Sequence, residues 1–271
     1  MAVLDHETIE TFRRDGVAVL RGVVDAAWRD RLAEAIEDNM ASPGPHGKNH
    51  ADDGGGAYFG DYVNWQRFGA FRDIGADGGL GRIAGELMGS RKVQLFHEHV
   101  LVKEPGNSSA TPWHQDLPYY CLDGSQTVSL WVPLDPVAKN VCPHFLAGSH
   151  EGQTTYVPRR FKTLKPLEGD TSTYKPFPDI DEERDVENLR SFDLEPGDAI
   201  AFDYHTLHNA PPNTASTRRR AVSLRYVGED VRFVDRPHEL SPPFTEMGLE
   251  LAMGDQLPED WFPTVWQSAS A

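Results

Sequence analysis

Residues 92–103 read Lys-Val-Gln-Leu-Phe-His-Glu-His-Val-Leu-Val-Lys, an apolar and partly alternating run that is typical of a β-strand. Similar runs follow at residues 127–134, 198–204 and 219–227, and segments with glycine and proline separate them. Several short strands joined by turns predict a β-sandwich or barrel-like core. The 24 glycines and 20 prolines also predict a loop-rich fold and disfavour an all-helical bundle.

The first third of the chain predicts helices that pack outside this core. Residues 5–15 are expected to form a short helix, and the branched run at residues 16–20 a strand. Asp25 can cap a second helix, because its carboxylate can accept a hydrogen bond from the first turn. The apolar side chains of this helix recur at every fourth position and form one stripe: Trp28, Leu32, Ile36 and Met40.

The segment at residues 41–65 has two open interpretations. Its first part, residues 41–60, is rich in proline, glycine, histidine and aspartate, and aromatic residues gather at its end: Tyr58, Phe59, Tyr62 and Trp65. Long loops in compact domains tend to be functional, so the segment is either a mobile lid over a substrate pocket or a surface loop anchored by its aromatic side chains. Residues 158–187 are interpreted as an excursion between strands.

The chain is expected to form one domain, residues 1–271, because it shows no internal repeat and no low-complexity linker. Within that domain, residues 1–90 are expected to form a helical N-terminal part with the lid. Residues 91–230 would form the β core, and residues 231–271 a C-terminal extension.

Composition excludes several classes of protein. The chain has 271 residues with 26 Lys+Arg against 42 Asp+Glu, a net charge of −16, which argues against binding to nucleic acid or to anionic membranes. No apolar run is long enough to span a bilayer, and no secretory signal is visible. Cys121 and Cys142 are too few for a disulfide scaffold. We therefore expect a cytoplasmic monomer or homodimer that acts on a small molecule.

The strongest local motif is Trp113-His-Gln-Asp116. On a strand, His114 and Asp116 would point to the same face while Gln115 faces away. A third metal ligand must come from elsewhere, and the segment Glu195–Asn213 offers two histidines, His205 and His208. Two histidines and one carboxylate leave three positions open on an octahedral metal, which is typical of non-haem Fe(II) oxygenases.

Further motifs along the chain form a combination that is more specific than any one of them: Phe12–Leu20, Lys103–Gly106, Trp113–Asp116, Gly148–His150, Glu195–Asp198, Leu207–Asn209 and Arg219. In this combination the sequence resembles the phytanoyl-CoA dioxygenase family of Fe(II)/2-oxoglutarate-dependent oxygenases. The resemblance implies a mainly β fold with flanking helices around a double-stranded β-helix (jelly-roll, cupin-like) core.

The resemblance also implies roles for individual residues. It makes His114, Asp116 and His208 the Fe(II) ligands and sets His205 aside. Arg219, eleven positions after His208, would bind the distal carboxylate of 2-oxoglutarate, for which a planar guanidinium is well suited. Further co-substrate contacts are implied at Lys103, His99, Trp131 and Ser223. The neighbouring Arg218 and Arg220 are expected on the opposite face of the strand.

Two other interpretations concern the histidine pair and the tryptophan. His97 and His99 also have strand spacing, but no acidic third ligand is suggested near them. Trp131 is either a co-substrate contact or an ordinary core residue. Aromatic side chains near the motif and the 41–65 segment are expected to line a pocket: Tyr58, Phe59, Trp65, Tyr119 and Tyr120.

The expected activity is hydroxylation of an unactivated C–H bond of a small organic substrate. Fe(II) would be the cofactor, with 2-oxoglutarate and O2 as co-substrates and succinate and CO2 as products. A carboxylate at Asp116 favours hydroxylation over halogenation, because the related halogenases have a small residue there. The alternatives are a non-catalytic metal- and ligand-binding jelly-roll protein and a metal-dependent isomerase or hydrolase that does not use O2.

Overall fold

The computed structural model describes residues 4–50 and 56–269. The helices within these ranges are α1 His6–Asp15, α2 Ala26–Ala41, α3 Ala70–Ala76 and α4 Leu80–Met88, with 3-10 turns η1 Leu117–Tyr119, η2 Lys139–Val141, η3 Glu151–Gln153 and η4 Val186–Asn188. The strands are β1 Val17–Leu20, β2 Lys48–His50, β3 Tyr58–Tyr62, β4 Lys92–Lys103, β5 Thr111–His114, β6 Leu122–Asp123, β7 Thr127–Pro133, β8 His144–Leu146, β9 Leu189–Arg190, β10 Ala199–Phe202, β11 His208–Ala210, β12 Arg219–Val227, β13 Arg232–Phe233 and β14 Thr264–Gln267.

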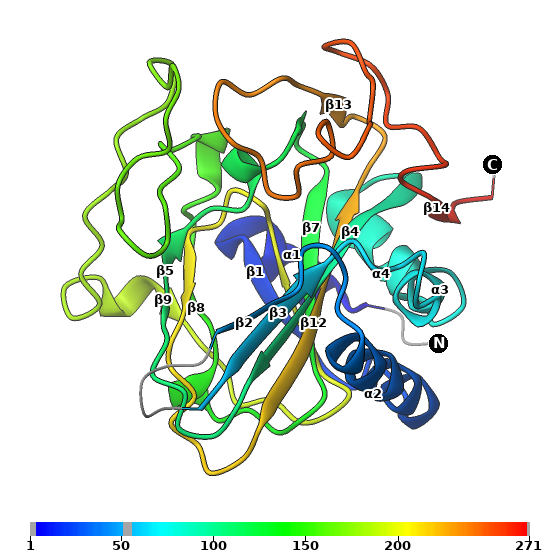
Figure 1. Cartoon of the computed structure of the whole chain (residues 1–271), viewed down its shortest axis with the longest axis vertical. Helices are drawn as coiled ribbons and strands as arrows, with labels where there is room; N and C mark the ends of the chain where they lie inside the picture. Colours follow the sequence, from blue (N-terminus) through cyan, green and yellow to red (C-terminus); the bar gives the residue numbers. More distant parts are fainter. Residues whose placement is uncertain (1–3, 51–55, 270–271) are drawn as a thin grey trace.

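Two antiparallel sheets form the centre of the molecule. The larger has the order β1-β10-β7-β12-β4-β3-β2, with β14 also paired to β4, and the smaller has the order β5-β11-β8-β9. Helices α2, α3 and α4 lie on one side of the large sheet and the small sheet lies on the other (Figure 1). The architecture is therefore mainly β with flanking helices, as the sequence predicts.

The strongest sequence signals correspond to observed elements. The runs at residues 92–103 and 219–227 are β4 and β12, the two central strands of the large sheet, which pair along their length. Asp25 caps α2 as expected, because its carboxylate accepts a 2.9 Å hydrogen bond from the backbone N–H of Trp28. The strand expected at residues 198–204 is shorter than predicted, since β10 ends at Phe202.

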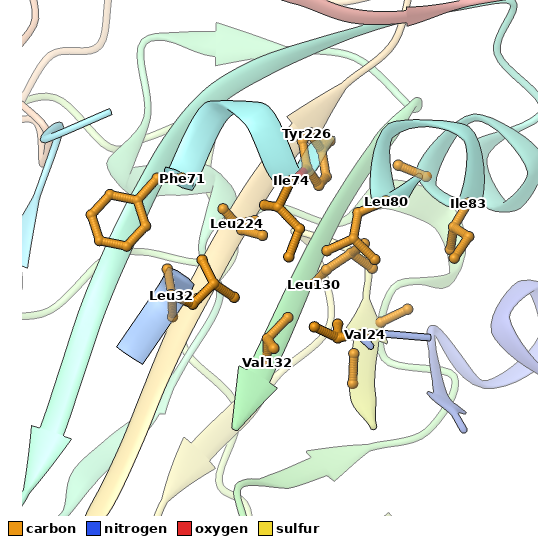
Figure 2. Close-up of a cluster of buried hydrophobic side chains, with 14 of the residues drawn as sticks. Val24, Leu32, Phe71, Ile74, Leu80, Ile83, Leu130, Val132, Leu224 and Tyr226 are labelled. Atoms are coloured by element: carbon orange, nitrogen blue, oxygen red, sulfur yellow. The ribbon is translucent and has the colours of Figure 1, made fainter. Parts of the chain in front are cut away.

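The outer face of the large sheet packs against the helices. Figure 2 shows Ile74 of α3 and Leu80 of α4 directed at the side chains of β7 and β12, among them Leu130 and Leu224. These four side chains are at most 1 % exposed, and burying each contributes roughly 1.5–3 kcal/mol. This apolar layer fixes the sheet, so the opposite face can carry polar groups.

The inner face of the large sheet carries polar and charged residues. Residues that lie opposite each other on paired strands point to the same side of a sheet. Two registered rows cross β4, β12 and β7 on this side, His97–Arg225–Ser129 and His99–Ser223–Trp131, and a third row, Lys103–Arg219, crosses β4 and β12. All eight side chains except that of His99 are almost completely buried, so the face is a polar interior rather than a solvated surface.

Two smaller expectations can also be compared with the structure. Cys121 and Cys142 are buried and free, as expected for small apolar side chains in the core. Within the described ranges, no helix is both long enough and apolar enough to cross a bilayer.

Glu98 provides a stability prediction on the outer face of β4. Its carboxyl group accepts hydrogen bonds from the backbone N–H groups of Asn64 and Trp65, and burial raises its pKa to about 8. A carboxyl whose folded-state pKa is raised contributes stability below its ordinary pKa of 4.5, and that contribution is lost as the pH rises through about 8. We expect the unfolding free energy of the wild type, relative to Glu98→Gln, to fall by a few kcal/mol over this range, because one pKa unit corresponds to about 1.4 kcal/mol.

Urea unfolding of both proteins across this pH range measures the difference in their unfolding free energies. The contributions of the other titrating groups cancel in this difference. The exposed Glu34→Gln serves as a control and should differ from the wild type by the same small amount at every pH. A constant difference between the wild type and Glu98→Gln would contradict the prediction.

Candidate metal centre

Two neighbouring strands of the small sheet bring His114 and His208 together. His114 is the last residue of β5, His208 is the first of β11, and the two are paired in register. Their ring centroids lie 4.2 Å apart. The histidines are 94 positions apart in the sequence, so strand pairing creates this proximity. His205 is not part of the cluster, because its Nδ1 lies 3.1 Å from the carboxylate of Asp203.

Asp116 reaches the two imidazoles from a turn. The expectation that it continues the strand of His114 is wrong, because β5 ends at His114 and Asp116 has helical backbone angles of φ −77° and ψ −43°. Its backbone N–H donates to the Tyr204 carbonyl at 3.0 Å, which holds the turn in place. Gln115 faces away as expected, and its amide donates to the carbonyls of Thr154 and His205.

Three acceptor atoms converge at this point. Asp116 Oδ1 lies 3.7 Å from His114 Nε2 and 3.8 Å from His208 Nε2, and the three lie within 4.8 Å of one another. Each histidine has its Nδ1 close to a backbone carbonyl, that of Pro112 at 2.8 Å or that of Thr206 at 2.9 Å. Because a carbonyl only accepts, each Nδ1 carries the hydrogen and each Nε2 presents a lone pair.

Burial keeps these groups in the protonation states that a cation requires. Burial, with the neighbouring His208, lowers the pKa of His114 to about 3, and burial also lowers the pKa of His208. Burial alone would raise the pKa of Asp116, but Arg225 and the two imidazoles outweigh it and hold this pKa below its ordinary value. Two neutral imidazoles and a carboxylate therefore face one point with no hydrogen between them, and this donor set fits a divalent cation such as Fe(II).

The second carboxylate oxygen of Asp116 is held by the large sheet. Arg225 Nη2 lies 3.4 Å from Asp116 Oδ2, and the Ser129 hydroxyl donates to the same oxygen at 3.2 Å. Arg225 also donates to the Tyr120 hydroxyl. These contacts occupy Oδ2 and leave Oδ1 directed at the imidazoles, so the carboxylate is oriented before any metal binds.

Replacement of Arg225 tests this orientation. We expect Arg225→Met to weaken metal binding by about 10–100-fold, the usual effect of losing a group that orients a ligand, and Arg225→Lys to recover part of the affinity. Titration of the metal-free protein with Co(II), which resists air oxidation, measures the change. Arg218→Met is the matched control, because Arg218 pairs with Glu37 and Glu104 away from the site. Equal affinity in Arg225→Met and the wild type would show that Arg225 does not orient Asp116.

Two cavities meet at the triad. The inner cavity, of about 430 Å³, lies between the sheets and is lined by Leu101, Trp131, Phe145, Phe202 and His208, among others. The outer cavity, of about 520 Å³, is lined by Tyr62, His97, Asp116, Tyr119 and Tyr120, among others. The residues that line both cavities are His99, His114, Phe161, Lys162 and Arg225. Both volumes are in the range of small-molecule sites, and the triad separates them.

The residues expected to contact the co-substrate lie on the inner face, at different distances from the cavities. His99 and Trp131 line the inner cavity, although Trp131 also packs in an apolar cluster with Phe145. Ser223 lies between them in the sheet, and its buried hydroxyl has no hydrogen-bond partner among the described residues. Lys103 donates to the carbonyls of Ser109 and Pro211, so its ammonium group supports the loops at the edge of the site.

Arg219 is buried at the end of the same face. It is 7 % exposed and donates to the Val141 carbonyl. Within the described ranges no carboxylate lies within ion-pair distance of its guanidinium, whereas Arg220 on the opposite face pairs with Asp135 at 2.9 Å. Burial lowers the pKa of Arg219 to about 10, which still leaves it charged at neutral pH. A buried cation without a counterion suits the carboxylate of a ligand.

Some of the residues that shape the site were not expected from the sequence. Arg225 is one of them, because its contact with Asp116 depends on the packing of the two sheets. Phe161, from the excursion at residues 158–187, lies over the His114 ring at 4.7 Å. In the 41–65 segment, of which residues 51–55 lie outside the described ranges, Phe59 and Trp65 are buried in the core. Tyr58 lines the inner cavity, and Lys48 and Tyr62 line the outer one. His97 and His99 are not part of a metal-binding cluster within the described residues.

Comparison with known proteins agrees with this geometry. The family profile described as phytanoyl-CoA dioxygenase (PhyH) matches residues 12–221. A probable phytanoyl-CoA dioxygenase from Caenorhabditis elegans is 24% identical over 182 residues, which cover 64% of this chain and 56% of that relative. The match therefore spans little more than half the length of this curated relative.

Two solved structures have a similar fold. The epimerase SnoN of nogalamycin biosynthesis, in complex with Fe3+, alpha-ketoglutarate and nogalamycin RO, has a TM-score of 0.75 at 20% identity over 96% of this chain and 97% of its own. The carbocyclase SnoK of nogalamycin biosynthesis has a TM-score of 0.74 at 21% identity over 96% of both chains. At this identity the likeness concerns the fold, which is that of non-haem oxygenases with a double-stranded β-helix. Because the family profile covers most of the chain, this protein belongs to the phytanoyl-CoA dioxygenase family of Fe(II)/2-oxoglutarate-dependent oxygenases.

Proposed function

We propose that this protein hydroxylates an unactivated C–H bond of a small organic substrate, with Fe(II) as cofactor and with release of succinate and CO2 from 2-oxoglutarate. The observation that carries the proposal is the convergence of three unprotonated acceptor atoms, from His114, Asp116 and His208, at the junction of two cavities. A site for a co-substrate on one side and a substrate on the other is what such a reaction requires.

The residues of the chain divide into three tasks in this proposal. His114, Asp116 and His208 hold the iron, and Arg225 fixes the orientation of Asp116. The inner cavity receives 2-oxoglutarate, with Arg219 as the partner of its distal carboxylate. When bound, iron and 2-oxoglutarate together supply the oxidising chemistry that uses O2 to attack a C–H bond.

The protein's own contribution is to position the substrate and to exclude water. Trp131, Phe145 and Phe202 form apolar walls of the inner cavity, and Phe161 lies against His114 where the two cavities meet. A site with such walls keeps bulk water from the reacting atoms. His99 and Ser223 remain proposed contacts of the co-substrate, and Lys103 is proposed to act through the loops that it holds.

Succinate release tests the proposal. The purified protein, supplied with Fe(II), 2-oxoglutarate and O2, should convert 2-oxoglutarate to succinate, and one coupled substrate among small acids, amines and acyl thioesters should raise the rate. Absence of succinate from the metal-loaded protein would favour a non-catalytic metal- and ligand-binding protein. Activity under strict anaerobiosis would favour an isomerase or hydrolase.

The mass of the product separates hydroxylation from other oxidations. Hydroxylation adds one oxygen atom to the substrate, epimerisation leaves its mass unchanged, and oxidative ring closure removes two hydrogen atoms. The epimerase and carbocyclase named above make the last two outcomes worth measuring. A product with one added oxygen would support the proposed hydroxylase. A product of unchanged mass would indicate an epimerase instead, and a product without two hydrogen atoms would indicate oxidative ring closure.

A further inference from the structure

The outer cavity carries an unusual charge for this chain. Five cationic side chains line it: Lys48, Arg159, Arg160, Lys162 and Arg225. The acidic side chains among its lining residues are Asp116 and Glu239. The whole chain has 42 acidic against 26 basic residues, so a cavity with an excess of cations is the opposite of its average surface.

The two acids neutralise two of the cations. Asp116 pairs with Arg225 at 3.4 Å, and Glu239 pairs with Arg160 at 3.4 Å. His97 and His99 also face the cavity but add no charge, because burial lowers both pKa values, that of His99 to about 3. The net charge of the wall therefore depends on the three remaining cations.

Those three cations, Lys48, Arg159 and Lys162, have no carboxylate within ion-pair distance in the described part of the chain. Lys48 on β2 and Lys162 are exposed, so they stand at the mouth of the cavity. Arg159 is half-buried, its Nη2 donates to the Trp113 carbonyl at 3.1 Å, and its guanidinium lies 3.6 Å from the centroid of the Phe177 ring. These contacts orient the guanidinium but leave its charge uncompensated.

The rest of the wall is largely aromatic and leads to the triad. Tyr119 and Phe161 contact each other edge to face at 5.7 Å, and both lie against the ring of His114. A ligand in this cavity would therefore have cations near the solvent and aromatic rings near the reacting centre. A molecule with one anionic end and one apolar end is complementary to both.

We propose that the substrate is a small anion whose charged group, a carboxylate or a phosphate ester, binds at Lys48, Arg159 and Lys162. Its apolar part lies along Tyr119 and Phe161, which directs a C–H bond toward the triad. This inference rests on the proposed function, since it assumes that the outer cavity faces the reacting centre.

A pair of fluorescent probes tests the preference for an anion. Anilinonaphthalene sulfonate is an aromatic anion, and phenylnaphthylamine is its uncharged analogue. Both are titrated into protein loaded with Zn(II) and 2-oxoglutarate, so that the inner cavity is filled. We expect the sulfonate to bind at least about tenfold more tightly, with an affinity that falls as salt is added.

Charge reversal at the cavity mouth locates the binding. Lys48→Glu/Lys162→Glu should weaken sulfonate binding at least about tenfold and leave the binding of phenylnaphthylamine unchanged. The matched control is Lys139→Glu/Lys175→Glu, which makes the same change of charge at exposed lysines that line neither cavity and should bind both probes like the wild type. Displacement of the sulfonate by benzoate or by phenyl phosphate then distinguishes a carboxylate from a phosphate.

Several results would overturn the proposal: equal affinities for the two probes, an unchanged sulfonate affinity in the cavity-mouth variant, or no displacement by either competing anion. Succinate release by the wild-type protein is measured in parallel. Succinate release together with failed binding tests would refute the anionic substrate and leave the proposed function intact. Anion binding without any succinate release would refute the proposed function instead.

Discussion

Asp116→Ala is expected to abolish the iron-dependent conversion of 2-oxoglutarate to succinate. The substitution removes one of three converging ligand atoms, and loss of a group that merely orients a ligand already costs about 10–100-fold. We therefore expect turnover to fall at least about a thousandfold. The variant also leaves Arg225 buried without its carboxylate, and breaking a buried ion pair destabilises a protein by about 3–5 kcal/mol.

Asp116→Asn separates ligation from stability. The amide has the shape of the carboxylate and can accept from Ser129 and Arg225, but it lacks the charge that attracts a cation. It should unfold at a higher temperature than Asp116→Ala, because Ser129 and Arg225 keep a hydrogen-bond acceptor, and still lose metal binding and turnover. Metal content, thermal unfolding and succinate release are compared in the same preparations.

His205→Gln is the matched control for this experiment, because His205 is a buried histidine near the triad that bonds to Asp203 instead. It should retain the metal stoichiometry of the wild type. Full turnover in Asp116→Asn, or loss of metal in His205→Gln alone, would show that the triad has been assigned to the wrong residues.

The sequence predicts the centre of the fold because its pattern there is set by burial on both faces. Strands β4 and β12 lie in the middle of the large sheet, between the helices and the polar interior, so both of their faces are covered and their strand pattern ends where the strands end. Asp25 is recognisable because a helix cap depends only on neighbouring residues. Elements defined by local interactions or by burial on both sides are thus visible in the sequence.

The bounds of helices α3 and α4 are not visible in the sequence, because both helices contain glycines at positions that need close packing. Glycine lowers helix propensity, so the segment resembles a loop. A Cβ atom on Gly85 would lie 2.4 Å from the Trp266 ring, and one on Gly81 would lie 3.0 Å from the side chain of Trp266. The glycines let α4 approach β14, a contact between segments about 180 residues apart that no local pattern reports.

The triad is partly visible and partly hidden in the sequence for a similar reason. His114 and Asp116 form a local motif, although the turn that joins them differs from the expected strand. The spacing leaves both His205 and His208 open as the third ligand, and only the family resemblance favours His208. Arg225 meets Asp116 only because β12 of the large sheet faces the turn that follows β5 of the small sheet, and the packing of the two sheets is a property of the folded chain.

Arg219→Ala is expected to weaken the binding of 2-oxoglutarate by at least about thirtyfold. The guanidinium of Arg219 is buried and has no carboxylate partner in the described ranges. In the proposed function it pairs with the distal carboxylate of 2-oxoglutarate, and truncating one partner of a buried charge pair costs about 2–5 kcal/mol. The affinity of Arg219→Lys for 2-oxoglutarate should lie between those of the wild type and Arg219→Ala, because an ammonium group keeps the charge but cannot make paired hydrogen bonds.

Calorimetric titration of 2-oxoglutarate into Zn(II)-loaded protein measures this affinity without turnover, and the KM for 2-oxoglutarate measures it during turnover. The rate at saturating 2-oxoglutarate should change much less than the KM, since Arg219 lies at the far end of the inner face from Asp116. Arg218→Ala changes the residue directly before β12, which pairs with Glu37 on the surface, and this variant should bind like the wild type. Unchanged affinity in Arg219→Ala would mean that the buried charge serves something other than a co-substrate, and it would strengthen the case for a ligand-binding protein that does not catalyse a reaction.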